Sequence, residues 1–309
     1  MMGSPIQLKL FGHDESLARG IFRLIKQQEN RLTVNRSHSE VMAINHAAGR
    51  HPVAVSEGVY ALVKRAHQVS LLPGSAFNLA VGPLVKRWKI GFQGSSVPPK
   101  NELQALLALT RPDNMTLDDA THSVFLHQAG MEIDLGAIAK GWIADRVRDY
   151  LLQQQVEGGL INLGGNIQAL GHPDSEGWRI GLKTPFAEAD ALTGVIQVAN
   201  KSVVTSGVYE RYFELNGRRY HHILDPRSGY PLDNELLSVT VISTDSIDGD
   251  IWTTLLYGMG VEKSLACLTE IPEIEAIFVT RDRQVICSSQ QHFSFTLLDD
   301  SYRMGVSLN

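Results

Sequence analysis

Two side chains with hard oxygen atoms, Asp250 and Thr254, have the spacing of a cation site. They lie four residues apart in the segment DSIDGDIWTTL, residues 245–255. On a helix, positions four apart share a face, so both oxygens can be offered to one cation. Mg²⁺ suits such a set, since it accepts few protein ligands and keeps positions for water and phosphate oxygens. The alternative is an acidic first turn, with Asp245 and Asp248, that only stabilises the helix dipole.

The densest group of reactive side chains lies just before that segment. Thr205, Ser206 and Arg211 are followed by His222 and Asp225, in segments that we expect a single hairpin to bring together. An imidazole beside a carboxylate can act as a general base. The Asp-Pro-x-x-Gly sequence after the histidine predicts a tight turn. The alternative, a core histidine with a turn-capping aspartate, has to account for all five residues together.

Two further motifs predict places where backbone approaches a ligand. An apolar strand ends in Asp134 and passes through Gly136 into a helix, a junction that offers free N–H groups to an anion. Asp134 as a simple helix N-cap is the equally weighted alternative. The Gly164–Gly165 pair interrupts a strand, as a close backbone approach or a tight turn requires. It does not match the GxGxxG pattern of dinucleotide-binding folds.

The elements that position these groups indicate an α+β fold. Apolar positions at helical spacing predict helices, and short β-branched or aromatic runs predict strands. Strands in runs, broken by isolated helices, favour α+β over regular βαβ winding. We expect one domain over residues 1–309, built from two lobes, with a Gly-, Ser- and Pro-rich loop near 93–101 as a candidate boundary. The predicted helices are 14–32, 40–48, one capped by Ser56, 102–109, 137–154, 246–258 and 261–270; the predicted strands are 4–11, 123–128, 159–163, 178–183, 193–199, 209–215, 236–243 and 275–280.

Composition excludes several classes of protein. Hydrophobic residues make up 43% of the 309, enough for a core, and no apolar stretch is long enough to cross a bilayer. A net charge of −5 provides no broad cationic face for nucleic acid. The only cysteines, Cys267 and Cys287, form neither a disulfide framework nor a thiolate zinc motif. The N-terminal segment has no export signal, so we expect a cytoplasmic protein without a membrane or nucleic-acid partner.

Taken in chain order, the four motifs resemble those of the ApbE-type flavin transferases. The similarity also includes Met2-Gly3-Ser4 and the segment AFNLAVGPLVKRW, residues 76–88, and so spans nearly the whole chain. The resemblance implies two mixed α/β lobes with largely antiparallel sheets and an FAD cleft between them. It also implies Mg²⁺-dependent cleavage of the substrate FAD, with FMN attached through its phosphate to a Thr or Ser of an acceptor flavoprotein and AMP released.

The same resemblance assigns roles residue by residue. His222 is expected to take the proton from the acceptor hydroxyl, and Asp225 to position the turn around it. The expected metal ligands are the carbonyl of Ala137 and the side chains of Asp250 and Thr254. The expected FAD-binding positions are Met2, Asn35, Ala76, Phe77 and Asn78 on the flavin nucleotide, with Asp134, Lys140 and the backbone near Leu224 on the adenosine side.

Three asparagines depart from the pattern of this family. Many relatives have Asp where this chain has Asn78, and often Asp where it has Asn166. Relatives often place an aromatic residue, a platform for the flavin ring, where Asn35 stands. A less covered flavin would admit water, so an FAD pyrophosphatase that makes FMN and AMP is the second hypothesis. The third is a flavin-binding protein without turnover, which the two asparagines at 78 and 166 motivate.

Overall fold

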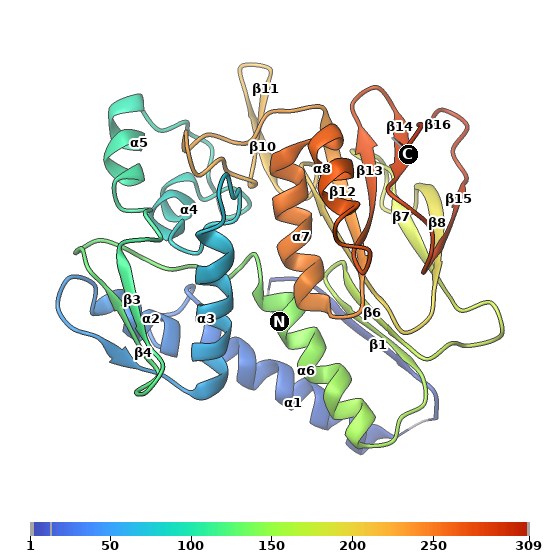
Figure 1. Ribbon diagram of the computed structural model, residues 1–309, viewed down its shortest axis with the longest axis horizontal. Helices are drawn as coiled ribbons and strands as arrows, with labels where there is room; N and C mark the ends of the chain where they lie inside the picture. Colours follow the sequence, from blue (N-terminus) through green and yellow to red (C-terminus); the bar gives the residue numbers. More distant parts are fainter. Residues whose placement is uncertain (1–2, 13, 308–309) are drawn as a thin grey trace. The chain divides into compact units, whose positions relative to one another are not determined.

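The computed structural model describes residues 3–12 and 14–307 and divides into two compact units. The first unit contains the described residues of Met1–Lys26, Lys140–Tyr209 and Asn234–Asn309. The second contains Gln27–Ala139 and Glu210–Asp233, so the chain enters and leaves it twice. Figure 1 traces both along the sequence. The stretch 93–101, where the sequence suggested a lobe boundary, lies inside the second unit.

An eight-stranded sheet organises the first unit, in the order β1-β5-β6-β9-β12-β13-β14-β16. Every neighbouring pair is antiparallel except β14 and β16. Central strands such as β12 and β13 are buried over nearly their whole length, because both faces of the sheet are covered. The strands are β1 Ile6–Leu10, β5 Gly159–Leu163, β6 Asn166–Leu170, β9 Ser202–Gly207, β12 Leu236–Ser243, β13 Glu275–Thr280, β14 Gln284–Cys287 and β16 Arg303–Met304.

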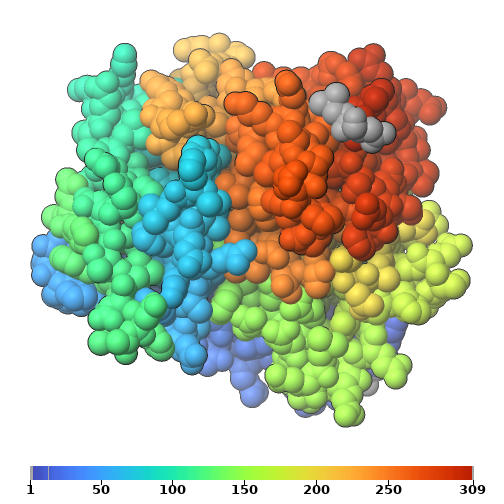
Figure 2. Space-filling view, viewed as in Figure 1, coloured from blue at the N-terminus to red at the C-terminus, as the bar shows by residue number. Residues whose placement is uncertain are grey.

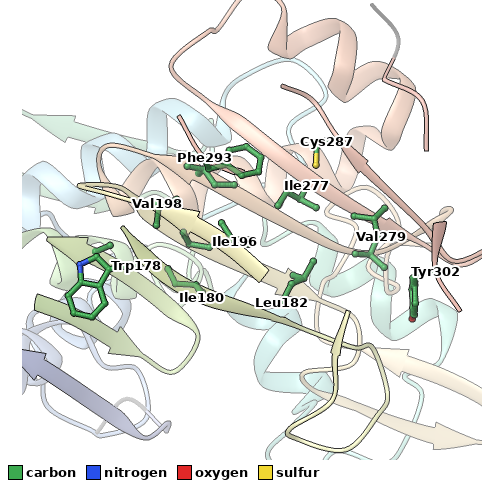
Figure 3. Packing of buried hydrophobic residues seen from close by; sticks show 14 residues of the cluster. Trp178, Ile180, Leu182, Ile196, Val198, Ile277, Val279, Cys287, Phe293 and Tyr302 are labelled. Carbon is green, nitrogen blue, oxygen red and sulfur yellow. The ribbon is translucent and has the colours of Figure 1, made fainter. Parts of the chain in front are cut away.

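A smaller antiparallel sheet covers one face of the large one. Its order is β15-β8-β7, formed by Ser294–Leu297, Leu192–Val198 and Trp178–Lys183. Residues of β7 alternate strictly between buried and exposed, so its apolar side chains all point to one side. Figure 3 shows these side chains meeting Ile277 and Val279 of β13. The interlocking of the two inner faces makes this the main core of the unit.

Helices lie against the other face of the large sheet. Helix α7, Ser246–Met259, packs on β9 and β12, and α8, Val261–Leu268, packs on α7. Helix α6, Ala139–Gln153, comes so close to α7 that a Cβ on Gly141 would lie 2.4 Å from the carbonyl oxygen of Ser246. Only glycine allows this approach. Figure 2 shows α7 and α8, in orange, at the surface of this unit.

The second unit combines short helices with two small antiparallel sheets. The α4/α5 region shares a core with the β10–β11 hairpin, where the indole Nε1 of Trp88 donates to the carbonyl of Gly229 at 2.7 Å. Gly229 has a φ of +77°, which glycine tolerates without strain. Helix α1, Glu15–Leu32, begins in the first unit and ends in the second. The other elements are α2 Glu40–His46, β2 Val53–Ala54, α3 Glu57–Ser70, α4 Gly82–Trp88, α5 Lys100–Leu107, β3 Met115–Asp118, β4 Ser123–Leu126, β10 Tyr212–Leu215 and β11 Arg218–His221.

The α+β class with largely antiparallel sheets is confirmed, and β5 and β7 have the predicted bounds. The strand predicted over 209–215 is wrong at its start, because the chain turns over 208–211 where it leaves the first unit. Helix α4 was not predicted from its seven residues, although Pro83 near its start is a typical helix-initiating residue. Within residues 3–12 and 14–307, no helix is both long and apolar enough to cross a membrane.

Candidate functional site

Asp250 is a buried carboxylate on α7 whose two hydrogen-bond donors are both neutral. The backbone N–H of Gly141 donates to Oδ2 at 2.6 Å, and the amide of Asn166 donates to Oδ1 at 3.0 Å. Only 8% of the residue is exposed. Burial raises the pKa of Asp250 to about 7, since the two hydrogen bonds and the charge of Lys140 offset only part of the desolvation. An anion held in this way is suited to a cation.

Thr254 lies one turn after Asp250 and is half-buried. Its hydroxyl lies 3.4 Å from the carbonyl oxygen of Asp250, a long bond within the helix that leaves the hydroxyl oxygen able to bind elsewhere. The donor set is therefore all oxygen, as Mg²⁺ prefers. Among the described residues, no cluster of three or more His, Cys, Asp or Glu side chains could hold a metal. Asp250 and Thr254, both on α7, are oxygen donors of the kind that Mg²⁺ accepts alongside water and phosphate oxygens. The third predicted ligand, the carbonyl of Ala137, belongs to the second unit.

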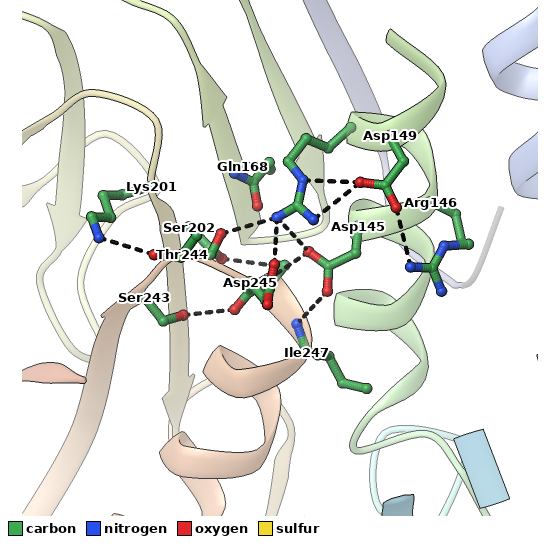
Figure 4. A network of polar contacts seen from close by, with 12 residues as sticks. Asp145, Arg146, Asp149, Gln168, Lys201, Ser202, Ser243, Thr244, Asp245 and Ile247 are labelled. Atoms are coloured by element: carbon green, nitrogen blue, oxygen red, sulfur yellow. Dashed lines mark hydrogen bonds and ion pairs between the residues drawn. The ribbon is translucent and has the colours of Figure 1, made fainter. Parts of the chain in front are cut away.

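The start of α7 is held by Asp145 of α6, a residue outside the four predicted motifs. Its carboxylate accepts the backbone N–H groups of Ser246 at 2.7 Å and Ile247 at 3.0 Å. Burial raises its pKa to about 6. Asp245, expected to stabilise this helix end, makes no side-chain cap and instead binds Arg148 at 2.8 Å. Figure 4 shows Asp145 and Asp245 within one network. The sequence carried a signal for this contact. Asp145 lies four residues after Gly141 and therefore on the same face of the helix, and Gly141 is where α6 approaches α7.

Lys140 and the glycine pair lie together in the first unit. The Lys140 amine donates to Ser4 Oγ at 3.3 Å and to the carbonyl of Gly164 at 3.5 Å. Gly164 and Gly165 have φ values of +62° and +94°, so the pair forms the tight β5–β6 hairpin turn that the sequence allowed. The lysine therefore lies beside exposed backbone at the tip of this hairpin.

Asp134 and Ala137 lie in the second unit, in the turns before α6. Asp134 Oδ1 accepts the N–H of Gly136 at 2.7 Å, and its own N–H donates to Leu79 at 2.8 Å. It is not the N-cap of α6, which begins only at Ala139. Burial raises the pKa of Asp134, with a contribution from the charge of Glu132. Ala137 is exposed.

Two of the residues expected near the flavin nucleotide, Phe77 and Asn78, line a cavity of about 460 Å³ in the second unit. Phe77 is buried and Ala76 half-buried. The side chain of Asn78 is used internally, donating to Thr110 O at 2.8 Å and accepting from Ala80 N–H at 2.8 Å. The polar and charged side chains on the cavity wall are Ser70, Ser75, Asn78, Thr110, Arg111, Asp113 and Arg227.

His222 follows directly after β11, and its ring is oriented by backbone. Nδ1 lies 3.2 Å from the carbonyl oxygen of Arg211. Because a carbonyl only accepts, Nδ1 carries the proton, and a neutral ring then has its lone pair on Nε2. The neighbouring His221 is buried, donates from Nε2 to Leu232 O at 2.7 Å and accepts Ile223 N–H at Nδ1 at 3.2 Å. His221 is thus the satisfied core histidine, and His222 the candidate base.

Asp225 stabilises the tight turn after these histidines. Its backbone N–H donates to Tyr230 O at 2.7 Å, and its carboxylate accepts the N–H of Arg227 at 2.9 Å. Leu224, next to it, is buried and bridges to Pro231. The predicted Asp-Pro-x-x-Gly turn is present, and it shapes the segment that follows His222.

One predicted grouping is wrong. A single hairpin does not bring the hydroxyls of residues 202–206 to His222, because Ser202–Gly207 is β9 of the first unit and the hairpin β10–β11 belongs to the second. Ser206 donates to Thr253 of α7 at 2.9 Å, and Thr205 lies 2.8 Å from Thr240. These hydroxyls are therefore involved in packing of the large sheet.

The structure gives few contacts for Asn35 and describes none for Met2, the two remaining predicted FAD-binding positions. Asn35 is exposed, and its backbone N–H donates to Thr33 Oγ1 at 3.1 Å. Met2 lies outside the described residues.

Comparison with known proteins gives a consistent result. A model of the ApbE family matches residues 2–278. A Klebsiella pneumoniae (strain 342) protein named FAD:protein FMN transferase is 63% identical over 304 residues, 98% of this chain and 95% of that protein. A Treponema pallidum (strain Nichols) protein of the same name is 40% identical and covers 87% and 78%. The ApbE protein of Thermotoga maritima has a TM-score of 0.81 at 30% identity, covering 90% and 92%. Pseudomonas stutzeri flavinyl transferase ApbE has 0.79 at 31%, covering 96% and 92%.

Proposed function

The chain belongs to the ApbE family, and we propose that it is a Mg²⁺-dependent FAD:protein FMN transferase. The observation that carries the proposal is the 63% identity to a protein of that name over nearly the whole chain. The proposed substrates are FAD and an acceptor flavoprotein with a Thr or Ser in a suitable motif. The expectation of a cytoplasmic location stays a prediction.

In the proposed reaction the acceptor hydroxyl attacks the phosphorus on the FMN side of the FAD diphosphate. A phosphoester bond to the Thr or Ser forms, the bond to the AMP phosphate breaks, and AMP leaves. His222 would take the hydroxyl proton at Nε2, which the Nδ1 contact with Arg211 O makes the basic nitrogen. Asp225 would keep this segment in place through its turn.

Asp250, Thr254 and the carbonyl of Ala137 are the proposed Mg²⁺ ligands. When bound, Mg²⁺ would neutralise charge on the diphosphate as the leaving oxygen departs. The buried Asp250, with only neutral donors on its oxygens, supports this part of the proposal. Asp134, Lys140 and the backbone near Leu224 are proposed for the adenosine side, and Met2, Asn35, Ala76, Phe77 and Asn78 for the flavin nucleotide.

The test is an incubation of the protein with FAD, Mg²⁺ and a peptide with a Thr in a Ser-Gly-Ala-Thr context. Mass spectrometry is expected to find an FMN adduct on the Thr, and chromatography an equal amount of AMP. A parallel sample with EDTA is expected to give neither product. Absence of an adduct on every acceptor tried, with FAD consumed, would reject the transferase.

An FAD pyrophosphatase is the second candidate, which the exposed Asn35 favours because it gives the flavin no aromatic platform. It predicts release of FMN and AMP without an acceptor, at a rate similar to that with one. A binding protein without turnover predicts FAD recovered uncut. The hydrogen bond from Asn166 to Asp250 argues against this third hypothesis, because it gives that asparagine a use in the proposed cation site.

A further inference from the structure

We propose that Asn166 is a positioning residue, which holds the carboxylate of Asp250 in the orientation that binds a divalent cation. It does so at the end of a chain of hydrogen bonds that starts at Ser202. The proposal rests on the proposed function, because it takes Asp250 to be a metal ligand. Its consequence is that cation affinity depends on residues that never touch the cation.

The chain of hydrogen bonds runs in one direction only. The Asp250 carboxylate accepts, so the Asn166 atom facing it at 3.0 Å is the NH₂ group. The Asn166 oxygen then faces Ser246, whose hydroxyl donates to it at 2.6 Å. Ser246 has thereby used its single proton, so Ser202 donates to Ser246 at 2.9 Å. Each donor is determined by the next acceptor, and the amide cannot flip without breaking two bonds.

The members of this chain are buried and come from three elements. Ser202 of β9 and Ser246 of α7 are fully buried, and Asn166 of β6 is 3% exposed. Hydrogen bonds at such depth have no water to replace them, so losing one leaves an unpaired polar group. The chain therefore connects α7, which carries Asp250, to two neighbouring strands of the large sheet.

Asn166 and Gly141 together hold the Asp250 carboxylate without using all of its lone pairs. Each donates to a different oxygen of Asp250, which prevents rotation of the carboxylate. A carboxylate oxygen has two lone pairs, so one on each oxygen stays available. A neutral amide also adds no positive charge that would compete with the cation for Asp250. An apolar side chain at 166 would supply no donor, and Asp250 Oδ1 would lose its orientation.

The experiment measures Mg²⁺ binding by titration calorimetry on the full-length protein without FAD. We expect N166A to weaken Mg²⁺ binding by about 10- to 100-fold, as loss of a group orienting a ligand does. S246A is expected to weaken it less, and the double variant N166A/S246A no more than N166A alone. D250A is expected to abolish binding.

Asn234 provides the matched control. Like Asn166 it makes two side-chain hydrogen bonds in the first unit, donating to Tyr257 O at 2.7 Å and accepting from Leu236 N–H at 3.0 Å. Tyr257 is on α7, so N234A loosens the same helix at a point away from Asp250. We expect N234A to lower the thermal midpoint while leaving Mg²⁺ affinity unchanged.

Two results would overturn the proposal. One is a folded N166A protein with wild-type Mg²⁺ affinity, and the other is an equal loss of affinity in N166A and N234A. Should N166A not fold, S246A decides, because it removes the bond that orients the Asn166 amide, together with the bond from Ser202, and keeps the amide itself. If the wild-type protein binds Mg²⁺ and releases AMP, and N166A and S246A do so equally well, only the positioning role is refuted. Wild-type protein that binds no Mg²⁺ refutes the cation site and the positioning role together.

Discussion

Two buried carboxylates of the first unit, Asp250 and Glu275, have opposite surroundings. Asp250 is 8% and Glu275 is 1% exposed. Asp250 accepts two neutral hydrogen bonds. Glu275 accepts four, from the Ser289 hydroxyl at 2.6 Å, the Gln291 N–H at 2.8 Å, and the N–H and ring Nδ1 of His292 at 2.9 and 2.8 Å. Burial alone therefore does not distinguish them.

Their pKa values differ in direction for this reason. Burial by itself raises the pKa of Glu275, but its hydrogen bonds outweigh that effect and the pKa is lowered. For Asp250 burial prevails, and the pKa rises to about 7. A carboxylate with a full set of donors stabilises a fold, here by holding the segment of residues 289–292 against β13. One with an incomplete set is available to a cation.

The D250A substitution is expected to have the largest effect on activity. Loss of a proposed metal ligand should slow AMP release by roughly 10⁴-fold, equivalent to about 5.5 kcal/mol of transition-state stabilisation. The thermal midpoint of the metal-free variant should not fall, since the change also removes a buried charge. Chromatography of AMP and a thermal melt test both statements. Wild-type AMP release by D250A would contradict the distinction between the two carboxylates.

Substitution of His222 is expected to have the next largest effect. H222A should slow FMN transfer to a peptide on the order of 10²- to 10⁴-fold, because the acceptor hydroxyl loses its proton acceptor. Its Mg²⁺ affinity, measured by calorimetry, should stay at the wild-type value. His221, like Glu275, is buried and has its hydrogen-bonding atoms paired within the fold, so H221A should mainly lower stability. Equal losses of transfer in both variants, after correction for folded protein, would remove His222 as base.

E275A should act on stability rather than on activity. It leaves three backbone or side-chain donors and one ring nitrogen without their acceptor, which should reduce the free energy of unfolding by about 3 kcal/mol or more. Urea unfolding monitored by circular dichroism measures this change. AMP release per folded molecule should stay near the wild-type rate. A stability loss below about 1 kcal/mol would mean that the four hydrogen bonds are replaced by water.

The smallest effect is a difference in pH dependence. Asp250 has a higher pKa folded than unfolded, so the folded metal-free protein holds the extra proton between about pH 4 and pH 7. Its stability contribution is present at low pH and is lost as pH rises through that window, by up to about 1.4 kcal/mol per pH unit. For Glu275, with its lowered pKa, the contribution is present above its unfolded pKa and is lost as pH falls.

Unfolding curves across pH separate these contributions. D250N should reduce the slope between about pH 4 and 7, although Asp145, with its pKa raised to about 6, adds a slope of the same sign. E275Q should instead reduce the slope on the acid side. Saturating Mg²⁺ should remove the Asp250 contribution to the wild-type slope between about pH 4 and 7, because the metal binds the ionised carboxylate and the unfolded chain is also ionised there. An unchanged slope in D250N would show that this carboxyl does not titrate there.

Local pattern was sufficient for much of the fold. Residues 159–163 and 178–183 form strands where their composition predicted them, and α7 begins at Ser246 as expected. The motif around His222 also contained its own turn, because Asp225, Pro226 and Gly229 are close in sequence. Features set by neighbours along the chain can be predicted from spacing.

Features set by distant residues could not be predicted in this way. Ser202–Gly207 was grouped with His222 because the two are near in sequence, yet it pairs with β6 and β12 in the other unit. The cap of α7 comes from Asp145, about a hundred residues earlier, instead of from the adjacent Asp245. Asn166 was noted only as a departure from the family, and its contact with Asp250 spans 84 positions.

The amino-acid sequence by itself determined the α+β class, the family and the residue types that can do the chemistry, because these depend on composition, periodicity and motif order. Tertiary structure alone decided which buried polar groups are satisfied. It gave Glu275 four donors from a segment 14 to 17 positions later, and Asp250 two donors from residues 84 and 109 positions earlier. The physical reason is that the cost of burying a charge depends on every donor around it, and no local pattern records those donors.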